Sequence, residues 1–331
     1  MLRDLGSRDS QFIEAVADIR RSLLDIAGVS AKEWTAVLLQ GSGTYAVEAV
    51  LQTSSPREGA RVLVIANGAY GKRMVQVCQV AGIDCDVIRF AEILPVDIEK
   101  ISAKLSSGVT YTTVCVVHCE TSSGVMNDVE TIGQLVRKLQ PKALYFVDAM
   151  SSFGAVPVEL SNVDFIVSSA NKCLQGVPGF SYAVARKSAL EKCEGNSRSL
   201  SLDLVEQEKG LASSGQFRFT PPTHTLLAFR QAVKEFYQEG GLAGRQRRSV
   251  VSTVSALSSL CTSDTKTTGK SSNLEWPPWD LKSSYQRSLP ATSSLASTIQ
   301  NIKTSPLRNS IRNFPILVKI DNIHQAREGG K

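Results

Sequence analysis

The chain contains 331 residues, 42% of them apolar, and carries a formal net charge of +6 at pH 7. A chain of this length and composition can bury a sizeable core, and it would ordinarily form one large domain and a smaller one. The basic residues are dispersed, and their densest cluster, residues 245–248 (RQRR), has no interleaved aromatic side chains, so the composition argues against nucleic-acid binding.

The first predicted elements are a helix, a strand and a second helix. Apolar residues at helical spacing predict a helix over residues 9–26, and a β-rich run predicts a strand over residues 35–39. The turn at residues 40–44 (QGSGT) then leads into a helix that contains Ala46 and Leu51. A turn of small residues at a helix N-terminus suits a phosphate because it presents free N–H groups and the positive end of the helix dipole. The same kind of turn often only connects a strand to a helix, so the pattern alone leaves both interpretations open.

A second polar loop follows the strand predicted over residues 62–66 and contains Tyr70 between two glycines. An aromatic side chain at the end of a strand could stack on a flat ring. The alternative is a tyrosine that only packs within its loop.

Strands are next predicted over residues 85–90 and 111–118, and a helix over residues 129–139. The second strand ends at His118 and runs into a polar loop that contains Thr121. A histidine in this position invites a role as a general base, but it also fits a structural residue.

Two short apolar runs, residues 143–147 and 165–167, read as buried strands, and each is followed by a charged residue, Asp148 and Lys172. Ligands of open α/β sheets bind at the carboxyl ends of the strands. An acid and a lysine in this arrangement suit pyridoxal 5′-phosphate (PLP), because the lysine can hold the aldehyde as a Schiff base and the carboxylate can pair with the protonated ring nitrogen. On spacing alone, an ordinary aspartate at a strand end and a surface lysine explain the pattern equally well.

The chain continues with a strand predicted over residues 180–185, polar loops at residues 195–204 and 217–225, and a helix over residues 226–237. Strands that alternate with helices predict an α/β fold with a mostly parallel sheet covered on both faces.

Three stretches, residues 40–45 (QGSGTY), 147–154 (VDAMSSFG) and 168–176 (SSANKCLQG), together resemble the class V branch of the fold-type I PLP enzymes. Within that branch, the chain resembles the 2-aminoethylphosphonate–pyruvate transaminases from about residue 4 to about residue 244. The loop at residues 195–204 resembles these transaminases closely and the serine–pyruvate and alanine–glyoxylate relatives much less. The resemblance implies a PLP-binding large domain over residues 1–248 and transamination of 2-aminoethylphosphonate with pyruvate to phosphonoacetaldehyde and alanine.

The resemblance also assigns roles to individual residues. Lys172 would hold the cofactor and move the substrate proton, and Asp148 would keep the ring nitrogen protonated. His118 is therefore expected to be structural. Thr220 would reach the cofactor phosphate of the neighbouring subunit, which implies a homodimer. The residues expected around the cofactor are Ser42, Gly43, Thr44, Tyr70, Thr121, Asp148, Asn171, Lys172 and Thr220.

The cysteines and the apolar segments bear on the compartment. Seven cysteines without a CxxC pair predict reduced thiols in an intracellular, cytoplasmic protein. No segment approaches the roughly 18 consecutive apolar residues of a membrane helix, and no signal pattern is present. Met1 falls where the family is already under way, so a targeting segment, for example a mitochondrial one, could have preceded it.

The character of the chain changes at residues 249–331, where about three in ten residues are Ser or Thr. This composition predicts a disordered tail in place of the family's small C-terminal domain. A sharper hypothesis is a shifted reading frame. Three stretches were translated back into codons and read in the same shifted frame: residues 275–281, 292–297 and 304–314. Their codons permit, in turn, MAALGF, IITSF and F-S-F-[KE]-[KE]-F-Y-K-[KE]-L. These sequences resemble parts of the small C-terminal domain and occur in the same order.

The family binds the anionic end of its substrate through an arginine of the small domain, and Arg287, Arg308 and Arg312 stand in the wrong context to supply it. A catalytically inactive truncated isoform is therefore an alternative, as is a serine–pyruvate or alanine–glyoxylate aminotransferase. A nucleotide-binding protein is disfavoured because residues 41–44 lack both the Gly-x-Gly-x-x-Gly spacing and the Walker lysine.

Overall fold

The computed structural model describes residues 5–247, and the chain divides into a unit of residues 1–246 and a unit of residues 247–331. The predicted tail, residues 249–331, lies outside the described residues.

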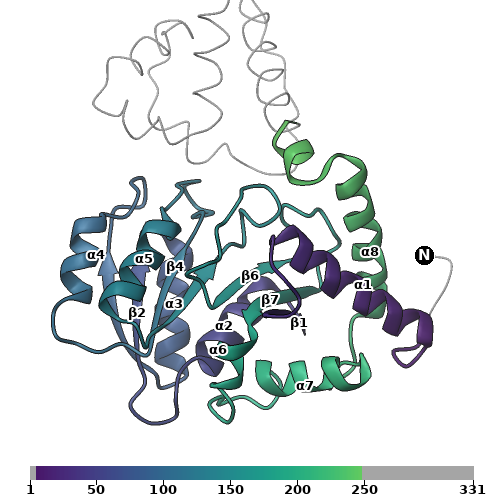
Figure 1. Ribbon diagram of the computed structural model, residues 1–331, viewed down its shortest axis with the longest axis horizontal. Helices are drawn as coiled ribbons and strands as arrows, with labels where there is room; N and C mark the ends of the chain where they lie inside the picture. The colour runs from purple at the N-terminus through teal and green to yellow at the C-terminus, as the bar shows by residue number, and fades with distance from the viewer. Residues whose placement is uncertain (1–4, 248–331) are drawn as a thin grey trace, which may run out of the picture. The chain divides into compact units, whose positions relative to one another are not determined.

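In the part of the chain that the structure describes, seven strands form one mixed sheet in the order β1-β7-β6-β5-β4-β2-β3 (Figure 1). Strand β7 pairs antiparallel with both β1 and β6, and the remaining pairs are parallel. This is the mostly parallel sheet that the sequence predicted. The strands are β1 (Trp34–Gln40), β2 (Arg61–Ala66), β3 (Asp84–Arg89), β4 (Thr113–Val117), β5 (Leu144–Asp148), β6 (Phe165–Ser169) and β7 (Phe180–Arg186).

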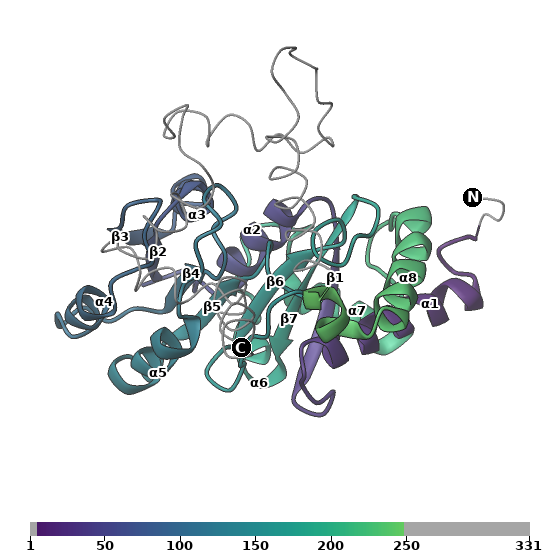
Figure 2. The same cartoon turned by 90° about the horizontal axis from the view of Figure 1, so that it is seen from above.

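The helices cover both faces of the sheet. Figure 2 shows α2 and α3 over one face and α4 and α5 over the other. Strands β4 and β6 are buried along their whole length, as expected of central strands in a sheet that helices cover on both faces. The helices are α1 (Ser10–Ile26), α2 (Gly43–Thr53), α3 (Ala69–Val80), α4 (Ile98–Leu105), α5 (Val129–Leu139), α6 (Lys187–Glu191), α7 (Leu204–Ser214) and α8 (Thr223–Gln238).

Aspartate side chains define where four of the helices begin. The carboxylates of Asp9, Asp97, Asp128 and Asp203 each accept a backbone N–H of the first turn of α1, α4, α5 and α7. A carboxylate in this position satisfies N–H groups that have no partner within the helix and also interacts favourably with the helix dipole. None of the helices within residues 5–247 combines the length and the apolar character needed to cross a membrane.

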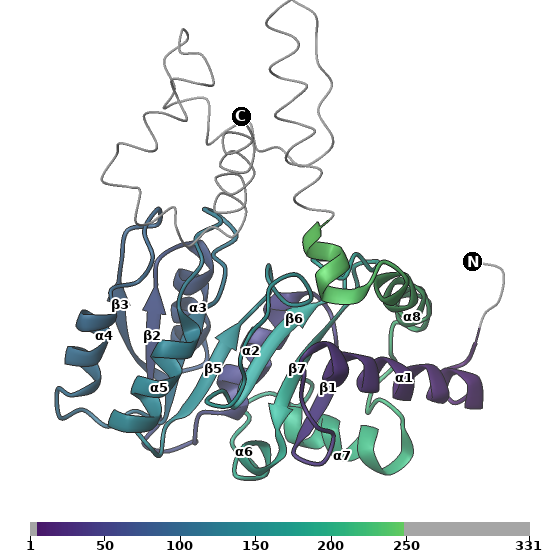
Figure 3. The same ribbon diagram turned by 45° about the horizontal axis from the view of Figure 1, so that its top comes forward.

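The strand topology brings several loops to one edge. Figure 3 shows the arrowheads of β2, β5 and β6 pointing to the same edge of the sheet. The loops that follow β1, β2, β5 and β6 therefore meet there, as the rule for open α/β sheets predicts.

Candidate active site

A cavity of about 150 Å³ lies at this edge. All the residues predicted around the cofactor, except Thr121 and Thr220, contribute to its lining. Asp148 ends β5, and Lys172 follows the end of the neighbouring strand β6 by three residues. The lining residues are Ser42, Gly43, Thr44, Val47, Tyr70, Arg73, Asp148, Met150, Ser169, Asn171 and Lys172.

The turn at the start of α2 has the features of an anion site. The first N–H groups of a helix have no partner within the helix, and the side chain of the N-terminal residue Ser42 does not cap them. An added Cβ at Gly43 would come within 2.3 Å of the Met150 Sδ atom, so the end of that side chain would have to shift. Gly41 has φ of +99°, and its N–H donates to the carbonyl of Gly179 over 3.0 Å, which fixes the path of the turn. We call Ser42, Gly43 and Thr44 the α2 turn.

Asp148 is buried, and its Oδ1 accepts the Met150 N–H over 2.8 Å. Burial raises the pKa of this carboxyl to about 6, although the Met150 hydrogen bond and the charges of Arg73 and Lys172 act in the opposite direction. Desolvation disfavours the charged form of an acid. A cationic N–H placed at this carboxylate would stabilise the ionised form, which makes Asp148 a fitting partner for a protonated ring nitrogen.

Lys172 stands in a tight loop that the sheet holds at both ends. The Ala170 N–H donates to the Phe180 carbonyl over 3.2 Å, and the Gly176 N–H donates to the Ala170 carbonyl over 2.8 Å. Within the loop, Gln175 adopts φ of +57°. The half-buried Lys172 is therefore presented to the cavity by a closed backbone turn and not by a flexible surface segment.

Tyr70 is held through both its backbone and its ring. Its N–H donates to the carboxylate of Glu120, which is fully buried, and the nearest donor–acceptor distance is 3.2 Å. Glu120 thus takes the place of a capping side chain for α3, because the residue before α3, Gly68, has none. The guanidinium of Arg73 lies over the ring, with its Cζ 4.7 Å from the ring centroid.

Arg73, Glu120, Met150 and Ser169 were not predicted to belong to the site. Two of them carried a signal that could have been used. Arg73 follows Tyr70 by three residues, a spacing that brings two side chains to one face of a helix, and Glu120 lies between His118 and Thr121 in a loop already singled out. The contacts of Met150 and Ser169 with the cavity follow only from the folded chain.

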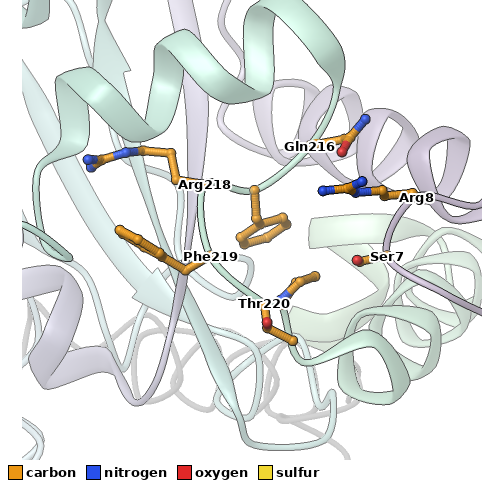
Figure 4. A pocket seen from close by; sticks show the side chains of 8 residues that line it. Ser7, Arg8, Gln216, Arg218, Phe219 and Thr220 are labelled. Carbon is orange, nitrogen blue, oxygen red and sulfur yellow. The ribbon is translucent and has the colours of Figure 1, made fainter.

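Thr121 and Thr220 lie outside this cavity. The hydroxyl of Thr121 bonds to that of Ser151, next to the lining residue Met150. Thr220 lines a separate cavity of about 350 Å³, which Ser7 and Arg8 reach from the segment before α1 (Figure 4). Figure 4 also shows the Arg218 side chain directed away from Arg8. The larger cavity therefore does not contain the predicted acid and lysine.

His118 has the structural environment that was expected of it. The residue is buried, and its Nδ1 lies 2.8 Å from the Ser152 hydroxyl oxygen. Burial lowers its pKa from 6.5 to about 4, so the ring is neutral at pH 7.

A pH-dependent prediction follows from this histidine. Between pH 6.5 and 4, the unfolded chain binds the His118 proton and the folded chain does not, so the contribution of His118 to stability is lost as the pH falls through this window. We expect His118→Asn, which can still bond Ser152, to remove up to about 3 kcal/mol of this pH dependence. Urea unfolding of both chains at pH 7 and pH 4.5 measures the difference, and an unchanged pH dependence in the variant would contradict it.

The comparisons with known proteins agree with the geometry. The Aminotransferase class-V family model matches residues 1–274. The 2-aminoethylphosphonate–pyruvate transaminase of Klebsiella pneumoniae is 44% identical over 252 residues, which cover 75% of this chain and 68% of the relative. The Paraburkholderia xenovorans transaminase of the same name is 47% identical over 250 residues, which cover 75% of this chain and 64% of the relative.

Among solved structures, the alanine–glyoxylate aminotransferase of a Nostoc species superposes with a TM-score of 0.68 at 27% identity, covering 76% of this chain and 67% of that one. An aspartate aminotransferase of Thermus thermophilus gives a TM-score of 0.64 at 24% identity, covering 74% of this chain and 67% of that one. These likenesses confirm the fold predicted from the sequence. The family match, the relatives and the fold agree, and the chain belongs to the class V aminotransferases.

Proposed function

We propose that this chain carries the cofactor-binding part of an enzyme that uses PLP to transfer the amino group of 2-aminoethylphosphonate to pyruvate, giving phosphonoacetaldehyde and alanine. The observation that carries the proposal is the meeting of Asp148 and Lys172 in one cavity beside the α2 turn. The substrate pair is supported by the name that relatives at 44–47% identity share.

The residues of the cavity fit this cofactor. The uncapped α2 turn suits a phosphate, the buried carboxylate of Asp148 suits a cationic ring nitrogen, and the amine of Lys172 suits an aldehyde. Asn171 lines the same cavity and adds an amide that accepts the Ser169 hydroxyl over 3.1 Å. When bound, PLP supplies an electron-accepting ring that stabilises the carbanion left when the substrate C–H bond breaks.

The chain's own groups then divide the work. Lys172 holds the cofactor, and its released Nζ takes the proton from the substrate carbon that bears the amino group. Asp148 keeps a proton on the ring nitrogen, and its burial strengthens this ion pair by excluding water. Tyr70 offers an aromatic face for stacking.

The same proposal includes a homodimer in which Thr220 serves the neighbouring subunit. Phe219 and Thr220 are both exposed, so this loop is accessible to a second copy of the chain. Thr121 would act next to the cofactor through its bond to Ser151. We also propose a cytoplasmic location, supported by the free thiols of Cys78, Cys85, Cys115, Cys119, Cys173 and Cys193.

Absorbance spectroscopy of the purified chain with PLP tests the proposal. We expect a band near the visible edge that shifts on addition of 2-aminoethylphosphonate, and we expect Lys172→Ala to abolish both the band and the shift because the cofactor loses its covalent attachment. Lys142→Ala, which removes an exposed lysine that lies outside the cavity, is the matched control.

Turnover with the phosphonate and pyruvate should then exceed turnover with alanine and glyoxylate. The reverse preference would assign the chain the alternative aminotransferase reaction. A chain without any lysine-dependent band would be an inactive form, and the proposed activity would fail for this polypeptide.

A further inference from the structure

Arg73 is the one residue of the described cavity lining, besides Lys172, that carries a positive charge. It lies on α3, one turn after Tyr70, and its side chain contacts two parts of the site at once. Its Nη1 donates to the Thr44 Oγ1 over 3.3 Å, and its guanidinium covers one face of the Tyr70 ring. Within residues 5–247, no carboxylate lies within ion-pair distance of this guanidinium, so no structural salt bridge neutralises its charge.

We propose that Arg73 is a positioning residue that couples the α2 turn to the Tyr70 ring and sets the preference of the site for a phosphorylated ring. The inference rests on the proposed function, because it assigns Arg73 a role toward the cofactor phosphate and ring proposed above.

The bond to Thr44 determines what the Thr44 hydroxyl can do. A hydroxyl has one proton to donate and two lone pairs to accept with. Because the Thr44 Oγ1 accepts the Arg73 N–H, its own proton is left to donate, and the charged donor polarises the hydroxyl and strengthens that donation. Thr44 is the second residue of α2, where the unpaired N–H groups already favour an anion. A phosphate oxygen is the acceptor that this arrangement suits.

The contact between Arg73 and Tyr70 acts on the orientation of the Tyr70 ring. A guanidinium stacked on one face of an aromatic ring is held by the ring's negative potential. Arg73 thereby restrains the plane of Tyr70 and leaves the opposite face for a flat ligand. Tyr70 is also anchored through its N–H by Glu120, so backbone and ring are fixed by different elements.

Arg73 and Lys172 are expected to serve different parts of the ligand. The amine of Lys172 would bond to the aldehyde, whereas the guanidinium of Arg73 takes no part in that bond. Arg73 therefore adds a second cationic side chain to a cavity that contains the carboxylate of Asp148 and would receive a phosphate.

Equilibrium dialysis of the full chain against PLP and against pyridoxal, which lacks the phosphate, tests this role. We expect Arg73→Met to weaken PLP binding about tenfold or more. Pyridoxal binding should fall only about two- to threefold, since it loses only the ring contact. Arg73→Lys should recover part of the loss by restoring the charge. Lys72→Met is the matched control, because it removes an exposed neighbouring charge outside the cavity.

A double substitution separates positioning from general folding damage. Since Arg73 acts through the Thr44 hydroxyl, Arg73→Met combined with Thr44→Ala should lose less PLP affinity than the two single losses added together. Additive losses would overturn the proposal, as would an equal loss in Lys72→Met or an unchanged ratio of PLP to pyridoxal affinity in Arg73→Met. An unmodified chain that binds no PLP would overturn the proposed function itself, whereas normal binding with an unaffected Arg73→Met would overturn only the role of Arg73.

Discussion

Replacing Asp148 with asparagine is expected to lower the rate of transamination on the order of 10²-fold or more, while the chain without cofactor becomes more stable. Asparagine keeps the shape of the side chain, and its Oδ1 can still accept the Met150 N–H. It cannot hold a proton on a ring nitrogen by charge, so the cofactor loses much of its electron-accepting power. The rate of amino transfer from 2-aminoethylphosphonate measures the first effect.

The stability effect has the opposite sign because a buried carboxylate without a cationic partner is costly. In the unfolded chain, the carboxyl ionises near its usual pKa of 3.8, whereas in the folded chain burial raises the pKa to about 6. The folded state therefore binds the proton more tightly, and the stability from this group is present below pH 4 and lost as the pH rises through 6. We expect Asp148→Asn to stabilise the cofactor-free chain by up to about 3 kcal/mol at pH 7.5, with little effect at pH 4.

Urea unfolding of the cofactor-free chain at the two pH values measures this gain, and Asp84→Asn is the control because Asp84 is exposed and lies outside the cavity. Full activity in Asp148→Asn would remove Asp148 from the proposed mechanism. Destabilisation at pH 7.5 would instead mean that the carboxylate has a compensating partner in the folded chain.

The second large effect is expected at Gly43. An alanine Cβ at this position would lie 2.3 Å from the Met150 Sδ and 2.4 Å from its Cε, so the end of that side chain must move. Met150 lines the cavity and is buried, so we expect the displaced side chain to occupy space needed by a ligand. Gly43→Ala should weaken PLP binding about tenfold or more, at a cost to stability of about 1–3 kcal/mol from overpacking.

The partner substitution provides the control. Met150→Ala removes the clashing atoms, so the double variant Gly43→Ala/Met150→Ala should bind PLP more tightly than Gly43→Ala alone. The helical backbone itself accepts alanine, which favours a helix by about 1 kcal/mol over glycine. Equilibrium dialysis measures the affinities, and unchanged binding in Gly43→Ala would show that Met150 can move without entering the cavity.

Several elements were not predicted from the sequence because they carry little local signal. Helices α4 (Ile98–Leu105) and α6 (Lys187–Glu191) are too short to show more than one or two turns of apolar periodicity. Helix α7 (Leu204–Ser214) was not predicted, and only its first residue falls within the polar loop predicted over residues 195–204; only a few of its residues are buried. Strand β4 (Thr113–Val117) is shorter than the predicted strand over residues 111–118. The side chains at both ends of that stretch have other roles, since the Tyr111 hydroxyl donates to Asp86 and His118 bonds to Ser152.

The sequence by itself determined the class of sheet, the family and the positions of Asp148 and Lys172 at the ends of strands. These are properties of short apolar runs and the polar residues that end them, and parallel strands necessarily bring their carboxyl ends to one edge. The tertiary structure alone decided which other side chains surround those strand ends. Glu120, Arg73 and Met150 enter the site through contacts between separate elements, such as the Glu120–Tyr70 and Arg73–Thr44 bonds. Side-chain contacts over such separations depend on packing, and local sequence patterns do not encode them.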